Sequence, residues 1–398
     1  MLEYRPMKPN NPFLVRGYAG PDWFCDRAAE TDRLVSSLEN DRDVTLIAPR
    51  RYGKTGLVHN VFHHLRGKMP TVYVDIFQTR SLADFTRLFS SAVAGALDTK
   101  LERAVAAAAR FFKSCRPTIS AGPDGAPSIS FDVVPSRAEE TLAETFAYLA
   151  RRDRRAVVAI DEFQQVLEYP ERGTEALLRS QIQFVPGVRF VFAGSRQHLM
   201  REMFLSPKHP FYQSTDILSL GPIDRAAYLA FARRHFRAAS LELSEEAFSA
   251  LYDRFGGVTW YLQMVLNRLW ARRRDVESSA AVEEVVSELL ETRALEYNDL
   301  LRSQPPSSQA VLRALAAEGT VAEPTSGAFV ARCGLGAAST AASALEALRR
   351  LDLVYETSAG WIVYDRFFGE WLARFAPPSP PPPRKRAATR ARSKRISP

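Results

Sequence analysis

Short apolar runs alternate with amphipathic stretches along the first half of the chain. The runs at 44–48, 71–77, 156–161 and 188–194 are rich in β-branched residues, which predicts buried strands. The stretches at 27–38, 56–65, 81–113 and 138–152 have a helical period. Strands that alternate with helices favour an α/β fold with a mainly parallel sheet and helices on both faces. A β-hairpin is expected to interrupt this order at about 117–134, because two alternating runs flank Asp124 and Gly125.

The second half of the chain has a different pattern. After residue 222 the apolar positions follow a helical period at 224–237, 244–253 and 260–270. Further helices are predicted at 308–319, 326–336 and 337–351, and a hairpin at 352–365, which is the order of a winged helix-turn-helix. We therefore expect four parts: a core at 1–221, a helical lid at 222–298, a winged helix-turn-helix at 299–375, and a disordered Pro-rich basic tail at 376–398.

Composition narrows the class of protein. No apolar run reaches the roughly 18 residues that a membrane span needs, and the N-terminal residues do not resemble a secretory signal. Cys25, Cys115 and Cys333 are scattered, which argues against a disulfide framework and against a zinc site. These features predict a cytoplasmic protein without a membrane partner. The formal net charge is +8, and residues 384–398 supply seven Lys or Arg and no acid, so about +1 remains for the rest.

The segment APRRYGKT at 48–55 lies between a predicted strand and a predicted helix. This is the position of a phosphate-binding P-loop, in which Lys54 reaches the phosphates of ATP and Thr55 ligates Mg²⁺. Ala48 stands where the GxxxxGK[ST] pattern has glycine. The other residues of this segment that are predicted to bind the nucleotide are Arg50, Arg51, Tyr52 and Gly53. Gly56, at the N-terminus of the predicted helix, is predicted to bind it as well.

Two further strand ends carry polar residues. Asp161 and Glu162 close the run at 156–161, where an acid faces the ligand crevice of a parallel sheet. We expect Asp161 to bind Mg²⁺, and Glu162 to activate water, with Lys54 as the second catalytic residue. Ser195 and Arg196 follow the run at 188–194, and either could sense the γ-phosphate.

These motifs together resemble the archaeal-type ATPase family, a P-loop NTPase family of the STAND class that is related to AAA+ proteins. The resemblance covers residues from about 10 to 375. It rests on PRRYGKT, on AIDEFQ and FAGS at the two strand ends, and on GGVTWYLQ at 256–263. It rests also on DRFFGEWL at 365–372 and on the N-terminal residues Phe24, Arg27, Glu30 and Leu34. The resemblance implies a RecA/AAA-like core, an N-terminal box with Arg27 near the adenine, and a lid that closes on the nucleotide. The aromatic residues Trp260, Tyr261 and Trp270 are expected in the lid core.

Three functions remain open at this point. The first is a Mg-dependent ATPase that hydrolyses slowly and acts as a regulatory switch on a protein partner. The second is an ATP-gated DNA-binding protein of the replication-initiator or regulator type. The third is a nucleotide-binding scaffold without turnover. The reading helix at 337–351 is mostly Ala and Ser, which predicts poor base readout, whereas the basic tail predicts sequence-independent attraction to nucleic acid. The sequence leaves open whether the chain forms a homo-oligomer.

Overall fold

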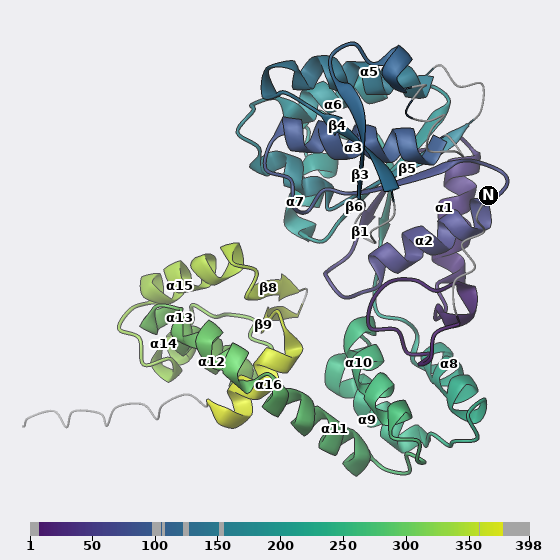
Figure 1. The fold of residues 1–398 in the computed structure, drawn as a ribbon. Coiled ribbons are helices and arrows are strands. Elements are labelled where there is room, and N and C mark those ends of the chain that lie inside the picture. The colour runs from purple at the N-terminus through teal and green to yellow at the C-terminus, as the bar shows by residue number, and fades with distance from the viewer. Residues whose placement is uncertain are drawn as a thin grey trace, which may run out of the picture. The chain divides into compact units, whose positions relative to one another are not determined.

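The computed structural model of the chain describes residues 8–97, 105, 108–121, 127–150, 155–357 and 359–376. The chain divides into two compact units, Met1–Val282 and Glu283–Pro398, and the division falls within helix α11 (Ser279–Thr292). The units are drawn in Figure 1. None of the helices in these described ranges has the length and apolar character needed to cross a membrane.

The first unit is built on a five-stranded parallel sheet with the order β2-β5-β6-β1-β7. Its strands are β1 (Val44–Ile47), β2 (Thr71–Asp75), β5 (Ala156–Asp161), β6 (Val188–Gly194) and β7 (Asp216–Ser219). The predicted strands at 44–48, 71–77, 156–161 and 188–194 are confirmed. Strand β7 was not predicted, because its sequence DILS has a single buried residue at the edge of the sheet and no apolar run.

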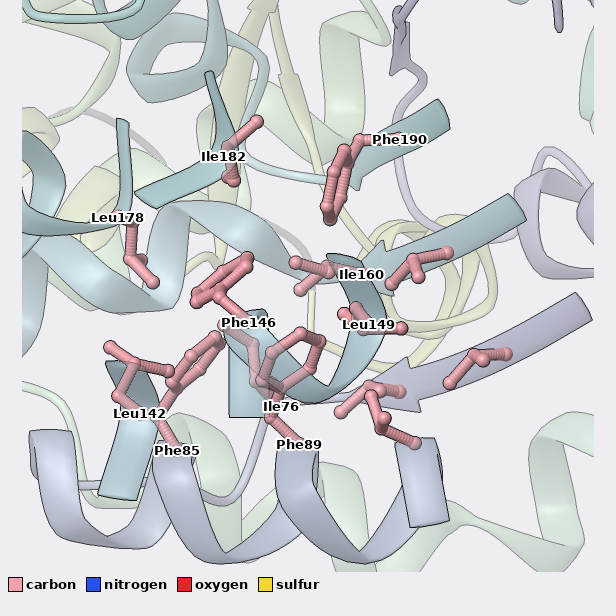
Figure 2. Packing of buried hydrophobic residues seen from close by; sticks show 14 of the residues in the cluster. Ile76, Phe85, Phe89, Leu142, Phe146, Leu149, Ile160, Leu178, Ile182 and Phe190 are labelled. Atoms are coloured by element: carbon pink, nitrogen blue, oxygen red, sulfur yellow. The ribbon is translucent and has the colours of Figure 1, made fainter. Parts of the chain in front are cut away.

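Helices cover both faces of this sheet (Figure 1), which confirms the predicted fold class. Successive residues of β5 contribute to opposite layers, as the pleat requires. Val157 and Ala159 pack in one hydrophobic cluster with residues of α1 and α2, whereas Val158 and Ile160 pack in another with residues of α3, α5, α6 and α7 (Figure 2). These helices are α1 (Ala28–Glu39), α2 (Lys54–Leu65), α3 (Leu82–Leu97), α5 (Ala138–Ala150), α6 (Thr174–Ile182) and α7 (Gln197–Leu205). Short 3-10 helices occupy Pro21–Trp23, Pro135–Arg137 and Phe163–Glu168.

The predicted hairpin between helices is confirmed by the antiparallel pairing of β3 (Arg116–Ala121) with β4 (Pro127–Asp132). Ile129 and Phe131 of β4 are buried in the same cluster as α3, so the hairpin extends the core. The predicted turn residues Asp124 and Gly125 lie outside the described residues, as do residues 98–104 of the predicted helix at 81–113.

Three helices, α8 (Arg225–Arg237), α9 (Glu245–Phe255) and α10 (Thr259–Ala271), follow the sheet within the first unit. The Asp224 side chain caps α8 by accepting a hydrogen bond of 3.0 Å from the Ala227 N–H. Between α9 and α10 the chain turns at Gly256 and Gly257, with φ of 56° and 68°. A Cβ atom on Gly257 would lie 2.6 Å from the Tyr252 hydroxyl, so this turn requires glycine.

The second unit has the predicted order of three helices followed by a hairpin. Its elements are α12 (Ala294–Arg302), α13 (Pro306–Glu318), α14 (Gly327–Arg332), α15 (Ala338–Arg350), β8 (Val354–Thr357), β9 (Gly360–Val363) and α16 (Arg366–Phe375). Val321 forms an antiparallel bridge with Trp361, which adds one residue to the edge of the hairpin. Phe367, Trp371 and Leu372 of α16 are buried. The predicted basic tail after residue 376 lies outside the described residues.

Candidate nucleotide site

The loop between β1 and α2 has the backbone of a phosphate-binding loop. Gly53 caps α2 with a left-handed backbone, at φ of 85° and ψ of 19°, and Arg51 is also left-handed, at φ of 74°. Ala48 does not belong to the described residues with positive φ. It is buried, and its N–H donates a hydrogen bond of 3.3 Å to the Gly194 carbonyl. Ala48 in place of the first P-loop glycine therefore introduces no backbone strain.

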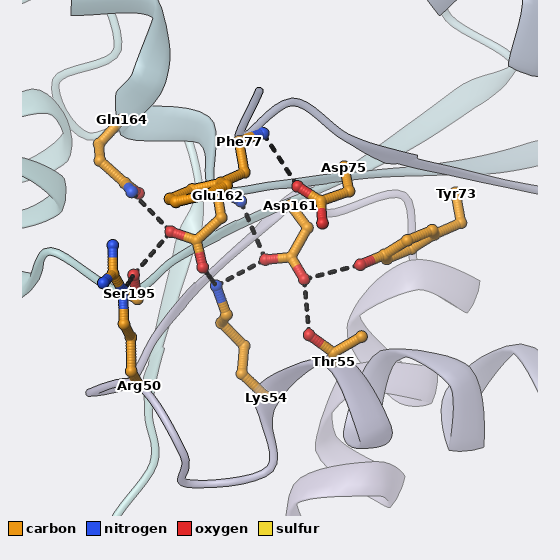
Figure 3. Close-up of polar contacts among 10 residues, drawn as sticks. All are labelled: Arg50, Lys54, Thr55, Tyr73, Asp75, Phe77, Asp161, Glu162, Gln164 and Ser195. Carbon is orange, nitrogen blue, oxygen red and sulfur yellow. Dashed lines mark hydrogen bonds and ion pairs between the residues drawn. The ribbon is translucent and has the colours of Figure 1, made fainter. Parts of the chain in front are cut away.

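Lys54, Asp161 and Glu162 form a buried charge cluster at the mouth of the sheet (Figure 3). The Lys54 Nζ atom lies 2.5 Å from Asp161 Oδ1 and 2.9 Å from Glu162 Oε1. The exposed fractions of the three side chains are 6%, 3% and 15%. One ammonium group therefore pairs with two carboxylates at the start of the P-loop helix.

The second oxygen of Asp161 accepts two further hydrogen bonds. Thr55 Oγ1 donates to Oδ2 over 2.7 Å, and the Tyr73 hydroxyl donates to the same atom over 2.8 Å. Burial alone would raise the pKa of Asp161, but the Lys54 ammonium and these hydrogen bonds lower it. Asp161 is therefore held as a carboxylate beside the Thr55 hydroxyl. A carboxylate and a hydroxyl are oxygen ligands that suit Mg²⁺, so the donor set fits this ion.

Glu162 is held by donors on both of its oxygens. Oε2 accepts hydrogen bonds of 2.6 Å from Ser195 Oγ and 2.6 Å from Gln164 Nε2, while Oε1 faces Lys54. Burial opposes its ionisation, but Lys54, Ser195 and Gln164 outweigh burial and lower the pKa of Glu162. The residue has a left-handed backbone with φ of 57°. Glu162 is thus kept ionised, which is the form that can accept a proton.

The two predicted sensor residues occupy different surroundings. Ser195 is buried and contacts Glu162, and Arg50 Nε donates to its hydroxyl over 3.4 Å. Arg196 pairs with Glu168 at 2.9 Å and is not among the residues that line the cavity described next. The structure therefore brings Ser195, but not Arg196, into contact with the acidic cluster.

A cavity of about 470 Å³ opens beside the loop. Its walls include residues of the P-loop, of the N-terminal segment and of α10, together with Glu162, Ser195 and Ile223. Arg27 lines it and is 4% exposed, with its guanidinium donating to the carbonyls of Tyr52 at 3.3 Å and Gly221 at 2.6 Å. Among the predicted site residues, those that line the cavity are Arg27, Arg50, Arg51, Tyr52, Gly53, Lys54, Thr55, Gly56, Glu162 and Ser195.

The first turn of α10 contacts the phosphate loop directly. The Trp260 N–H donates to the Arg51 carbonyl over 3.0 Å, and the Thr259 hydroxyl donates to the Tyr52 carbonyl over 3.5 Å. The Arg51 guanidinium lies 4.4 Å from the Trp260 ring centre and 5.1 Å from that of Tyr261. Tyr261 is buried as expected, but Trp260 is half-buried and lines the cavity, so its assignment to the lid core is wrong.

Sequence analysis missed Tyr73 and Gln164, which donate to the two carboxylates. A signal was present for each. Tyr73 lies in the middle of β2, where alternation directs it to the α2 side, and Gln164 follows Glu162 by two residues. Neither position specifies a hydrogen-bond partner, because that depends on the pairing of β2 with β5 and on the 3-10 turn after Glu162.

Comparison with known proteins gives two family matches. A family described as a probable winged helix domain matches residues 295–374. A family described as an ATPase domain predominantly from Archaea matches residues 24–265. Comparison with curated proteins gives no match.

Among solved structures, a Walker-type ATPase of Pyrococcus abyssi is similar, with a TM-score of 0.63 at 18% identity over 91% of this chain and 99% of that one. The ORC2 protein of Aeropyrum pernix, solved in ADPNP and ADP complexes, has a TM-score of 0.54 at 17% identity over 91% of this chain and 95% of that one. The ORC1 protein of the same organism, solved in complex with DNA, has a TM-score of 0.52 at 16% identity over 92% of this chain and 96% of that one. At these identities the likeness concerns the fold.

The ATPase match spans more than half of the sequence and includes the P-loop, the acidic strand end and the start of α10. It confirms the resemblance drawn from PRRYGKT and AIDEFQ. The chain belongs to the family of ATPase domains found predominantly in Archaea, and a winged helix domain follows its ATPase domain.

Proposed function

We propose that the chain binds ATP with Mg²⁺ in the cavity beside the P-loop and hydrolyses it slowly. The observation that carries the proposal is the convergence of Lys54 and Thr55 with Asp161 and Glu162, within hydrogen-bonding distance of one another. The phosphates would lie along the loop N–H groups and exchange with the carboxylates as partners of Lys54. Mg²⁺, held by Thr55 and Asp161, would neutralise phosphate charge.

Glu162 is proposed as the general base. It would accept a proton from water while the water oxygen bonds to the γ-phosphorus and the bond to the β-phosphate oxygen breaks, giving ADP and inorganic phosphate. Ser195 donates a hydrogen bond to the Glu162 carboxylate and lines the cavity. This supports a γ-phosphate sensor role for Ser195 rather than for Arg196. Slow turnover is expected, because Glu162 has to exchange Lys54 and two short hydrogen bonds for water.

We further propose that the ATPase is a regulatory switch of the STAND class. Support comes from the contact between α10 and the strained Arg51 position of the P-loop. A phosphate group that reorganises the loop would alter the contacts of Arg51 with Trp260 and Tyr261, and so bias the position of α8, α9 and α10. The output would be an altered interaction with a protein partner, or assembly with further copies of the chain.

DNA binding gated by ATP is the second candidate. The winged helix match and the seven basic residues at 384–398 favour it. Helix α15 is a poor reader of bases. Its two arginines, Arg349 and Arg350, are both paired with Glu346, at 2.8 Å and 3.2 Å, and its exposed side chains are otherwise small. Binding would therefore be electrostatic and independent of sequence.

Lys54→Ala should reduce ATP affinity by at least about 100-fold, because a charge-assisted phosphate contact is lost. Isothermal titration calorimetry would measure the affinity. Lys68→Ala is the matched control. Lys68 lies just after the end of α2, is 60% exposed and pairs with Glu39. Unchanged ATP affinity in a folded Lys54→Ala protein would remove the nucleotide assignment.

Glu162→Gln should bind ATP but hydrolyse it about 10²- to 10⁴-fold more slowly, because the proton acceptor is lost. Single-turnover hydrolysis of labelled ATP measures this rate. Glu168→Gln is the control. Glu168 lies six positions further along the chain, is exposed and pairs with Arg196, so this variant should hydrolyse ATP like the wild type. Normal turnover by Glu162→Gln would exclude Glu162 as the base.

Arg51→Ala should uncouple the lid helices from the nucleotide. In the wild type, ATP should change the hydrogen–deuterium exchange of the amides at 256–271. In the variant this change should shrink, because the cation–π contacts with Trp260 and Tyr261 are gone. Arg268→Ala, an exposed position of the same helix, is the control. An identical ATP response in Arg51→Ala would argue against signalling through this contact.

Deletion of residues 377–398 separates the two candidate functions. If the tail drives DNA binding, the deletion should lower affinity for any duplex and flatten the dependence of the binding constant on salt, while ATP hydrolysis continues. Fluorescence anisotropy at several salt concentrations measures both quantities. Sequence-specific binding that survives the deletion would instead assign DNA readout to the winged helix.

A further inference from the structure

Gln263 is a buried polar residue that lines the nucleotide cavity. It lies in α10, is 7% exposed, and its Oε1 atom is buried without a hydrogen-bond partner among the described residues. A buried carbonyl oxygen without a donor costs about 1–3 kcal/mol in general, so such a group is rarely left unsatisfied. The position of this acceptor suggests that a bound molecule supplies the missing donor.

The neighbours of Gln263 determine which atom of its amide lacks a hydrogen-bond partner. The Tyr228 hydroxyl donates to the Thr259 carbonyl over 3.3 Å, and Gln263 is hydrogen-bonded to the same hydroxyl. Because that hydroxyl has a single proton, the group that Gln263 presents to it must be the Nε2 amide N–H. This arrangement leaves Oε1 as the unpartnered atom. Turning the amide would remove the donor from the Thr259 carbonyl.

The place of Gln263 along α10 sets it apart from the phosphate loop. Thr259, in the first turn, contacts the Tyr52 carbonyl, and a Cβ on Gly53 would lie 3.9 Å from its side chain. Gln263 follows one helical turn later, on the same face and about 6 Å further along the axis. Apolar residues line the same cavity, among them Val15, Phe24 and Ile223. A nucleotide with its phosphates on the loop would have its base at this end.

We propose that Gln263 Oε1 accepts a hydrogen bond from the exocyclic amine of adenine and that this contact selects ATP over 6-oxopurine nucleotides. The inference rests on the proposed ATP binding and adds the residue that reads the base. A 6-oxopurine places a carbonyl oxygen where adenine has its amine, so two acceptors would face each other and neither would be satisfied. Tyr228 acts as a positioning residue, since it holds the amide in the orientation that favours adenine.

The test compares the dissociation constants of ATP and inosine triphosphate, which carries a 6-oxo group and lacks the 2-amino group of guanine. The wild type should bind ATP at least about tenfold more tightly than inosine triphosphate. Gln263→Met, similar in size but without the acceptor, should bring the ratio close to one, chiefly by weakening ATP. Tyr228→Phe keeps Gln263 but frees its amide to turn, so the ratio should fall there by tighter binding of inosine triphosphate. Arg268→Met, on the exposed side of α10, should keep the wild-type ratio.

Each outcome decides a specific point. If the wild type binds neither triphosphate, the proposed function fails and this inference fails with it. If the wild type binds both equally, ATP binding stands and base selection by Gln263 is overturned. A preference for ATP that persists in Gln263→Met would likewise overturn base selection by Gln263. If Gln263→Met does not fold, the test still rests on the ratio of the two dissociation constants in the wild type and in Tyr228→Phe.

Discussion

The site depends on the compensation of two buried carboxylates by one ammonium group. Asp161 and Glu162 are neighbours in sequence and largely buried, and without Lys54 their mutual repulsion and their burial would favour protonation. With Lys54 in place, the pKa of each carboxylate is lowered and both remain ionised. The hydrogen bonds from Thr55, Tyr73, Ser195 and Gln164 then complete the shell around their oxygens. A phosphate that competes for Lys54 would therefore disturb the whole cluster, which links nucleotide binding to the state of the proposed base.

The order of strands in the sheet makes this cluster possible. Strand β6 lies between β1, which leads into the P-loop, and β5, which ends at Asp161. Since all three strands are parallel, their carboxyl ends meet at one edge. Ser195, which follows the middle strand β6, donates a hydrogen bond to Glu162 there. The close approach also constrains Gly194, where a Cβ atom would lie 2.4 Å from Gln164 Oε1 and from Met200. A side chain at that position would displace the glutamine that holds Glu162.

Much of this arrangement could be predicted from sequence, because its signals are local. The order of strand, GKT loop and helix identifies the P-loop, and an acidic pair at the end of an apolar run identifies the opposite side of the site. Features that depend on contacts between distant segments could not be predicted. Strand β7 is recognisable only by its pairing with β1, since DILS has no strand pattern of its own. The aromatic residues of α10 have a sequence pattern that is typical of a buried core. That Trp260 lines the cavity follows only from the packing of the first turn of α10 against Arg51.

The packing of α10 against Arg51 stabilises a strained backbone conformation in the P-loop. A left-handed conformation is unfavourable for a residue with a Cβ atom, at roughly 1–2 kcal/mol, and it persists where the surroundings determine it. At Arg51 the surroundings are supplied by α10, through a hydrogen bond to the backbone carbonyl and two aromatic rings around the guanidinium. The loop conformation and the position of α10 are thus stabilised by the same contacts. Because Gln263 lies one turn further along α10, the helix that steadies the phosphate loop also carries the residue that we propose reads the base. A ligand that engages both ends of the cavity would then fix α10 at two points, whereas a phosphate group alone would fix only one.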